Sequence, residues 1–311
     1  MISLENAAKM ICEQQHPFLP TSIGIEVWRQ RFALEQEKQV YLHEVDMYCE
    51  KIVAPNLPAF GVKLFFPKGH NLSQRLPVVY YIHGGQFMRG DAQTYHKLIA
   101  ELTMRANVCL VFVEYALAPE QKAPVQFLQS QEGFLALEKL ALKYPLDLNR
   151  LILVGDDVGA SIAVSLAVKH KDAKIYKLVL FTPVVNANFD TSSYHSFAGG
   201  YDLSREQMKW AWEQYLGANA STDPLFSPLL WSKQDLATLP KTLLITAEAD
   251  VVRDEGEALG RKMRDAGVEV AQVRIQGIIH DFVVKHSLDK TNACRIAMNL
   301  AVDWIRKKDY K

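Results

Sequence analysis

The sequence has no excess of charge of either sign. Its 311 residues contain 35 lysines and arginines against 35 aspartates and glutamates. Strong non-specific binding to nucleic acid or to an anionic membrane needs an excess of positive charge, so we expect neither as a partner. Hydrophobic residues make up 49% of the chain. This content is enough to fill the core of one large α/β domain.

Cysteine is scarce, and long apolar runs are missing. The four cysteines, at positions 12, 49, 109 and 294, form no C-x-x-C pair and have no spacing typical of metal ligands. We therefore expect neither a metal site nor another cofactor. Charged side chains interrupt residues 1–15, and no apolar run reaches the length that spans a membrane. A reduced, cytoplasmic location without a membrane span is the expectation.

Two kinds of segment alternate along the rest of the sequence. Short apolar runs rich in β-branched residues alternate with longer amphipathic segments, which is typical of a mostly parallel central sheet flanked by helices. The pattern predicts an α/β fold with strands near residues 62–66, 78–82, 108–113, 151–154, 178–181, 243–246 and 270–275. It predicts helices near residues 93–105, 125–143, 160–170, 205–216, 255–266 and 292–307.

Two regions do not follow this alternation. Residues 1 to about 50 are helical in pattern and precede the sheet, and residues 186–222 are rich in aromatic side chains. Both are candidates for a helical cap over a site on a single domain of residues 1–311. The aromatic residues can equally fill a core, because aromatic side chains dominate cores in general.

The segment Gly155-Asp156-Asp157-Val158-Gly159 is the most informative part of the chain. An apolar strand at 151–154 runs into it, and a helix of small residues follows. α/β-Hydrolases present a nucleophilic serine in Gly-x-Ser-x-Gly at such a junction, where the glycines permit a strained turn and close packing. Asp157 occupies the position of that serine. Ser161 lies one helical turn later, and we interpret it as a packing residue.

A second signal follows the strand at 78–82, where the chain reads His83-Gly84-Gly85. Glycine leaves the backbone N–H groups of Gly84 and Gly85 open to a substrate oxygen, and with the N–H of Val158 they would form an oxyanion hole. The same residues can also make an ordinary tight turn. The candidates for the substrate pocket are Gln86, Phe87, Trp210 and Trp212.

Several motifs occur in the same order as in a known family. They are His83-Gly84-Gly85, the segment Glu114-Tyr115-Ala116-Leu117-Ala118-Pro119-Glu120, Asp223-Pro224-Leu225-Phe226-Ser227-Pro228, residues 246–256, and Gly277-Ile278-Ile279-His280-Asp281-Phe282. On these motifs the chain resembles, from about residue 60 to 305, the hormone-sensitive-lipase-like family of α/β-hydrolase esterases. The resemblance implies the α/β-hydrolase fold and a catalytic triad.

In the triad that the resemblance implies, Asp250 is the acid and His280 is the base. Along the chain, the elbow residue comes first, then the acid and then the histidine, which is the order found in α/β-hydrolases. Asp254 and Glu255 compete for the acid role, but they fall at a helix start, where carboxylates complement the helix dipole. His286 competes with His280 and lacks the motif.

The chain departs from the pattern of that family at four positions. Gln86 replaces the third glycine of the oxyanion loop, and Ala116 replaces an arginine. Asp281 replaces the glycine after the base and adds a second carboxylate near the imidazole. Asp157 replaces the nucleophile.

Three interpretations of Asp157 remain open. The first, which we favour, is a hydrolase of short or medium acyl esters whose ester hydrolysis is impaired or absent because the serine is gone. The second is an aspartate nucleophile, as in haloalkane dehalogenases and epoxide hydrolases, although the tryptophan that follows the nucleophile there is Val158 here. The third is a non-catalytic protein that binds a small ligand, as plant gibberellin receptors do on a related scaffold. The oligomeric state stays open, a homodimer included.

Overall fold

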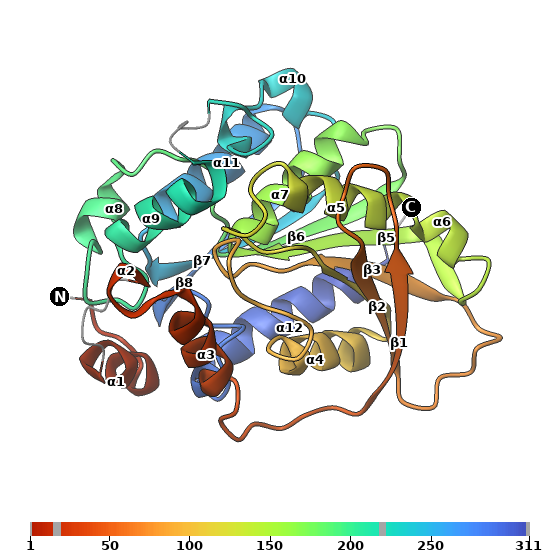
Figure 1. Ribbon diagram of the computed structural model, residues 1–311, viewed down its shortest axis with the longest axis horizontal. Coiled ribbons are helices and arrows are strands. Elements are labelled where there is room, and N and C mark those ends of the chain that lie inside the picture. Colours follow the sequence, from red (N-terminus) through yellow and green to blue (C-terminus); the bar gives the residue numbers. More distant parts are fainter. Residues whose placement is uncertain (1, 15–19, 218–221, 309–311) are drawn as a thin grey trace.

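The structure, a computed structural model, describes residues 2–14, 20–217 and 222–308. Within these residues, one eight-stranded sheet forms the centre of the molecule, with the strand order β1-β2-β4-β3-β5-β6-β7-β8 (Figure 1). The strands are β1 (Val45–Ile52), β2 (Phe60–Pro67), β3 (Leu76–Ile82), β4 (Cys109–Glu114), β5 (Leu146–Asp156), β6 (Ile175–Phe181), β7 (Thr242–Ala249) and β8 (Val270–Ile279).

The sheet is mostly parallel, as the alternation of segments predicts. Strands β1 and β2 pair antiparallel with each other, and β2 pairs antiparallel with β4. All strand pairs from β4 to β8 are parallel. The central strands β3 to β7 consist mostly of buried residues, with β5 fully buried from Leu151 onward, which is the pattern of strands covered on both faces.

Helices cover both faces of the sheet (Figure 1). Helices α4 and α12 lie against one face and contact each other, whereas α5, α7 and α11 lie against the other. The helices of these two layers, with the short elements between them, are α4 (His96–Ala106), α5 (Val125–Leu135), α6 (Leu137–Leu140), α7 (Asp157–Lys169), α10 (Lys233–Leu236), α11 (Arg253–Asp265), α12 (Asn292–Arg306), and the 3-10 turns η1 (Pro228–Leu230) and η2 (His286–Leu288). None of the helices in the described ranges is long and apolar enough to cross a membrane.

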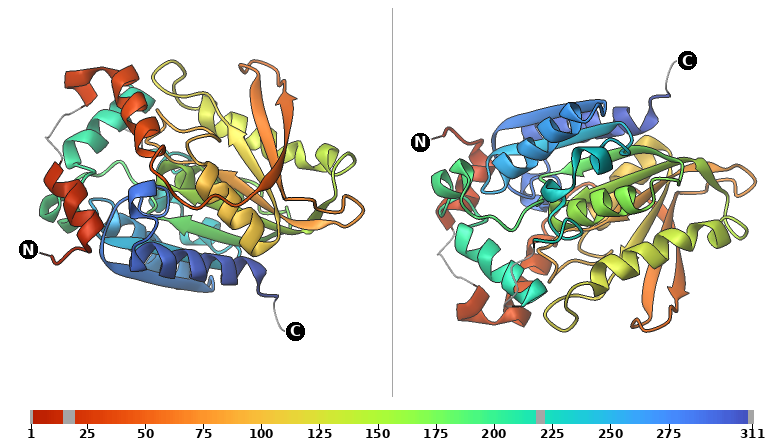
Figure 2. Two further views of the ribbon diagram at one scale, coloured as in Figure 1. Left: turned by 90° about the horizontal axis from the view of Figure 1, so that it is seen from below. Right: turned by 90° about the horizontal axis from the view of Figure 1, so that it is seen from above.

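Five more helices gather beyond the carboxyl ends of the strands, from two segments far apart in the sequence (Figure 2). They are α1 (Asn6–Gln14), α2 (Pro20–Ile23), α3 (Ile25–Glu35), α8 (Ser192–Ser196) and α9 (Arg205–Leu216). An edge-to-face contact joins Trp28 of α3 to Trp210 of α9, with the ring centroids 5.8 Å apart. The sequence places a cap at 1–50 and 186–222; of these residues, 1, 15–19 and 218–221 lie outside the described ones.

Two expectations about local structure are wrong. Residues 45–52, which the sequence pattern includes in a helical region, form the edge strand β1. None of its residues is buried, and half-buried and exposed side chains alternate along most of it, so it lacks the apolar run that marks the inner strands. The helix expected at 125–143 is divided into α5 and α6 around Ala136.

Candidate active site

Asp157 lies at the sharp turn between β5 and α7. Its φ of +48° is in the left-handed region, which is strained for a residue with a side chain. A Cβ atom on Gly159 would lie 2.1 Å from the carbonyl oxygen of Ile82, so glycine is required for α7 to pack directly against the end of β3. The backbone therefore has the strand–turn–helix geometry expected of a nucleophile elbow.

Asp250, His280 and Asp157 converge at the carboxyl ends of three strands. Asp250 follows β7 and His280 follows β8. Nδ1 of His280 lies 2.7 Å from Oδ2 of Asp250, and its Nε2 lies 3.4 Å from Oδ1 of Asp157. All three residues are buried. A second carboxylate, that of Asp281, has Oδ1 3.3 Å from the same Nε2.

The competing residues of the sequence analysis are held elsewhere. Asp254 accepts a hydrogen bond from the Ser193 N–H at 2.8 Å, and Glu255 accepts one from the Val185 N–H at 2.7 Å. The ring of His286 contacts the Lys38 carbonyl oxygen. Ser161 is buried, and its hydroxyl donates to the carbonyl oxygen of Val184, in keeping with a packing role.

The carboxylates around His280 control its charge. Burial works against the charged imidazolium, but Asp250, Asp281 and Asp157 outweigh burial and raise the pKa of His280 well above its usual range. Burial opposes the charged form of Asp157 as well, but contact with His280 lowers the pKa of this carboxyl. The pKa of Asp281 is raised, first by burial and then by the neighbouring Asp157, against the opposing influence of His280. An imidazolium facing the Asp157 carboxylate is therefore the favoured state.

The oxyanion loop differs from the expectation at Gly84. The N–H of Gly84 donates to Oδ1 of Asp156 at 3.0 Å, so this N–H is already used and is not open to a substrate. The next residues, Gly85 and Gln86, have φ values of +81° and +57°. In this conformation the N–H of Gln86 donates to Oδ2 of Asp157 at 2.7 Å. Gln86 thus supplies a backbone donor at the elbow that sequence reasoning missed.

Asp156 is another residue that sequence reasoning missed. Besides the Gly84 N–H, its carboxyl group accepts hydrogen bonds from the hydroxyls of Tyr81 at 2.8 Å and Tyr95 at 2.9 Å. Burial, the nearby Asp281 and Asp157 raise its pKa to about 8. Asp156 thereby ties the oxyanion loop to the end of β5. Its position directly before the elbow residue, at the end of a buried strand, is the signal that could have identified it.

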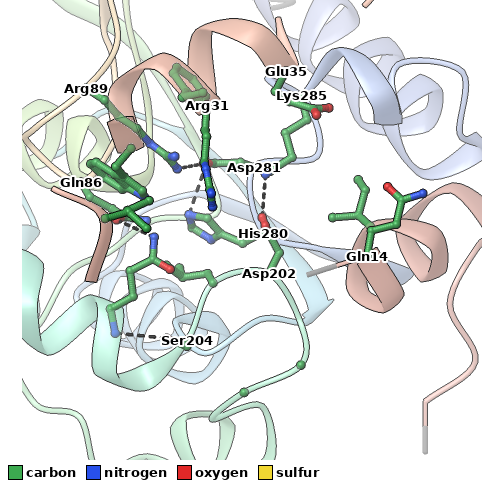
Figure 3. Close-up of a pocket in the computed structure, with 18 of the residues that line it drawn as sticks. Gln14, Arg31, Glu35, Gln86, Arg89, Asp202, Ser204, His280, Asp281 and Lys285 are labelled. Atoms are coloured by element: carbon green, nitrogen blue, oxygen red, sulfur yellow. Dashed lines mark hydrogen bonds and ion pairs between the residues drawn. The ribbon is translucent and has the colours of Figure 1, made fainter. Parts of the chain in front are cut away.

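A cavity of about 620 Å³ opens onto this centre (Figure 3). Its wall comes from α1, α3, the segment 199–207, the oxyanion loop and the loop after β8. Of the pocket candidates from the sequence, Gln86 lines the cavity, and its side chain accepts a hydrogen bond from Gln207 of α9 at 3.1 Å.

The other three pocket candidates pack behind the cavity wall. Phe87 stacks on Tyr215 with the ring centroids 3.5 Å apart, and Trp212 meets the edge of Phe87. Trp210 packs against Trp28, which is itself a lining residue. These aromatic side chains support the wall and do not line it. Among the residues that the structure describes, no cluster of three or more His, Cys, Asp or Glu side chains could hold a metal ion.

Residues 79–284 match the family described as alpha/beta hydrolase fold. This chain belongs to that family. R526 of Acanthamoeba polyphaga mimivirus, whose name places it among the alpha/beta hydrolases, is 37% identical over 276 residues, which are 88% of this chain and 78% of that protein. The ethyl acetate hydrolase of Pseudomonas putida is 31% identical over 227 residues, 71% of each chain.

The fold of this alpha/beta hydrolase also matches a solved esterase structure. The crystal structure of a thermostable esterase from Pseudomonas putida ECU1011 superimposes with a TM-score of 0.92 at 31% identity, and the match covers 98% of this chain and 97% of that one. Further relatives are named esterase or carboxylic ester hydrolase. This alpha/beta hydrolase is therefore a member of a family of carboxylic ester hydrolases.

Proposed function

We propose that the chain carries the site of a carboxylesterase of the hormone-sensitive-lipase-like type, with Asp157 at the position of the nucleophile. The observation that carries this proposal is the triad-like arrangement of Asp250, His280 and Asp157. Nδ1 of His280 lies 2.7 Å from Oδ2 of Asp250, and Nε2 lies 3.4 Å from Oδ1 of Asp157. Such an arrangement is the geometry of an acid, a base and a nucleophile in acyl transfer.

With serine at position 157, each group of the site has a role. His280 takes the proton of the attacking hydroxyl and later gives it to the leaving alcohol, while Asp250 holds the imidazole in the required orientation. We assign the oxyanion donors to the N–H groups of Gly85, Gln86 and Val158. Val158 is in the first turn of α7, where the helix itself does not need the N–H groups.

With aspartate at position 157, ester hydrolysis is impaired or absent. A carboxylate has no proton to give to His280, and its attack on an ester would form a mixed anhydride. Oδ2 of Asp157 also occupies the Gln86 N–H that a substrate oxygen would need. Removing the nucleophile of a comparable triad costs about 10⁶ in kcat, which is roughly 8 kcal/mol of barrier.

We further propose short or medium acyl esters as the substrates of the serine form. The cavity is of a size for small molecules, and α1, α3 and the segment 199–207 close it as a cap on one domain. The name of the Pseudomonas putida relative, ethyl acetate hydrolase, agrees with a small ester.

A second candidate is a hydrolase with Asp157 as a working nucleophile. One observation favours it: Oδ2 is held by the Gln86 N–H, while the buried Oδ1 has no hydrogen-bond partner among the described residues and faces His280. Against it, Val158 follows the elbow residue where haloalkane dehalogenases and epoxide hydrolases have tryptophan, and relatives of this chain are named esterases. We therefore rank this function second.

The test of the first proposal is Asp157→Ser, compared with Asp157→Ala as the matched control. We expect the serine variant to hydrolyse short p-nitrophenyl esters several orders of magnitude faster than the original chain. The alanine variant removes the same carboxylate without adding a nucleophile and should stay inactive. A folded serine variant no faster than the alanine variant would show that the assigned roles of Asp250 and His280 are wrong.

A further inference from the structure

Arg89 is a cation in the wall of the cavity, next to the reaction centre. It lines the same cavity as His280 and Asp281, and Figure 3 shows its guanidinium group turned toward these two residues. Its side chain is 11% exposed. A charge so far removed from water needs a close partner to offset the loss of hydration.

The contacts of Arg89 do not provide such a partner. Its ion pair with Asp281 has an N–O distance of 3.8 Å, which is too long for a hydrogen bond. Its Nε is buried and has no hydrogen-bond partner among the described residues.

Two other cations of the same wall are paired much more closely. Lys285 lies 2.6 Å from Asp202, and Lys38 lies 2.9 Å from Glu35. Both distances are those of charge-assisted hydrogen bonds. Arg89 differs from these two lysines because its guanidinium N–H groups are not taken up by a carboxylate at that distance.

Two aromatic rings hold the guanidinium of Arg89 in place. Trp28 and Phe32, one turn apart on α3, have ring centroids 4.3 and 4.4 Å from its Cζ. Trp28 is in turn packed edge-on against Trp210 of α9. Rings over the faces of a guanidinium leave its N–H edge for a planar acceptor. The arrangement is that of a pre-oriented binding group.

We propose that Arg89 binds a carboxylate of the substrate, so that the preferred esters carry a second, ionised carboxyl group. A carboxylate matches the planar N–H edge of a guanidinium and can accept two parallel hydrogen bonds from it. The extra carboxylate belongs either to the acyl part or to the alcohol part of the ester. The catalytic half of this inference rests on the proposed esterase function, but the binding half does not.

The test uses the Asp157→Ser chain and three esters. Monoethyl glutarate carries the carboxylate on the acyl part, acetoxyacetate carries it on the alcohol part, and ethyl pentanoate is neutral. The readout is the kcat/KM of each anionic ester divided by that of the neutral one. We expect Arg89→Met to lower this ratio about 10-fold to 100-fold for one of the anionic esters, and that ester identifies the part that faces Arg89.

Two further variants make the result specific to Arg89. Lys38→Met removes a cation that is already paired with Glu35 in the same wall, and it should change the ratio less than about 5-fold. Arg89→Lys keeps the charge without the planar fork, so its ratio should fall between those of the Asp157→Ser chain and Arg89→Met. The lysine variant also decides the question if the methionine variant does not fold.

The outcomes separate this inference from the proposed function. If the Asp157→Ser chain hydrolyses these esters but neither Arg89→Met nor Arg89→Lys changes the ratio of kcat/KM between anionic and neutral esters, the inference is overturned. The esterase proposal is not affected by that result. If Asp157→Ser hydrolyses no ester at all, the esterase proposal fails, and calorimetry with monoethyl glutarate and with acetoxyacetate on the unsubstituted chain decides the inference. Binding that weakens at least about 10-fold in Arg89→Met supports it. No binding, or equal binding in both chains, overturns it.

Discussion

The backbone N–H of Gln86 donates a hydrogen bond to Oδ2 of Asp157 at 2.7 Å. The other carboxylate oxygen faces Nε2 of His280 at 3.4 Å. One carboxylate thus touches both the loop donor and the base, as the acid released from an ester would do. Under the proposed esterase function, Asp157 therefore lies where the carboxylate of the acid product would bind.

An isotope experiment distinguishes the two interpretations of Asp157 that involve catalysis, an aspartate nucleophile and an esterase site that has lost its serine. If its carboxylate attacks substrate, water must cleave the resulting ester, and repeated turnover in ¹⁸O water places label in the side chain of Asp157. We expect neither label nor turnover with haloalkanes or epoxides. Mass spectrometry of the peptide that contains Asp157 is the measurement, and the peptide with Asp250 is the internal control. Label in the Asp157 peptide alone would establish the aspartate nucleophile.

Replacing Asp157 should lower the pKa of His280. In the original chain Asp250, Asp281 and Asp157 raise this pKa well above its usual range, despite burial. Asp157→Ser removes one of these carboxylates, so the imidazole should lose its proton at lower pH. An NMR titration of His280 in both chains is the check. An equal or higher pKa in the serine variant would mean that the pair does not act as described.

The raised pKa of His280 also determines how its contribution to the stability of the fold depends on pH. A folded pKa above the unfolded value means that the folded state holds the proton more tightly, so the contribution to stability is complete below about pH 6.5. It is lost as pH rises through the folded pKa. Denaturant unfolding between pH 6 and 9 should therefore show a steeper decline for the original chain than for Asp157→Ser.

Asp156→Asn should also change the pH dependence of stability. The folded pKa of Asp156 is raised from 3.8 to about 8, so between these values the folded state binds more protons than the unfolded state. The free energy of unfolding then falls with rising pH, by at most about 1.4 kcal/mol per pH unit from this group. Asparagine can keep the hydrogen bonds from Tyr81 and Gly84 and does not titrate. The variant should gain stability relative to the original chain from pH 4 to 8, whereas Asp172→Asn, on an exposed turn, should not.

Gly159→Ala should destabilise the fold. The added Cβ would lie 2.1 Å from the Ile82 carbonyl oxygen, and these are backbone atoms that cannot rotate away. Overpacking of this kind costs about 1–3 kcal/mol or more. Gly199→Ala is the matched control, because nothing lies within 4 Å of its added Cβ. Equal unfolding free energies for the two variants would contradict the close packing of α7 on β3.

The sequence predicted the inner strands well because each is an apolar run covered on both faces. Strand β1 was missed because none of its residues is buried. The resemblance to a known family also predicted that Asp250 and His280 meet at the elbow, since parallel strands bring their carboxyl ends to one edge of the sheet. Their catalytic roles remain a prediction.

The details of the oxyanion loop and of the cavity could not be predicted from the sequence. The direction of the Gln86 N–H depends on the left-handed backbone of two successive residues, which composition does not reveal. Aromatic content likewise marks a cap region without telling which rings face a cavity. Phe87, a predicted pocket residue, stacks on Tyr215, whereas Trp28, in the predicted cap segment 1–50 but not among the predicted pocket residues, lines the wall beside Arg89.

The cavity wall has a consequence for how such a protein can diversify. The groups that would break the ester bond come from the ends of β5, β7 and β8, but α1, α3 and the segment 199–207 supply most of the surface that a substrate first meets. Substitutions in those outer segments can change which molecule is accepted while the sheet and its reacting groups stay intact. Apart from Arg89, which lies three residues after Gln86 in the oxyanion loop, the residues that select a substrate can therefore change independently of the residues that would react with it.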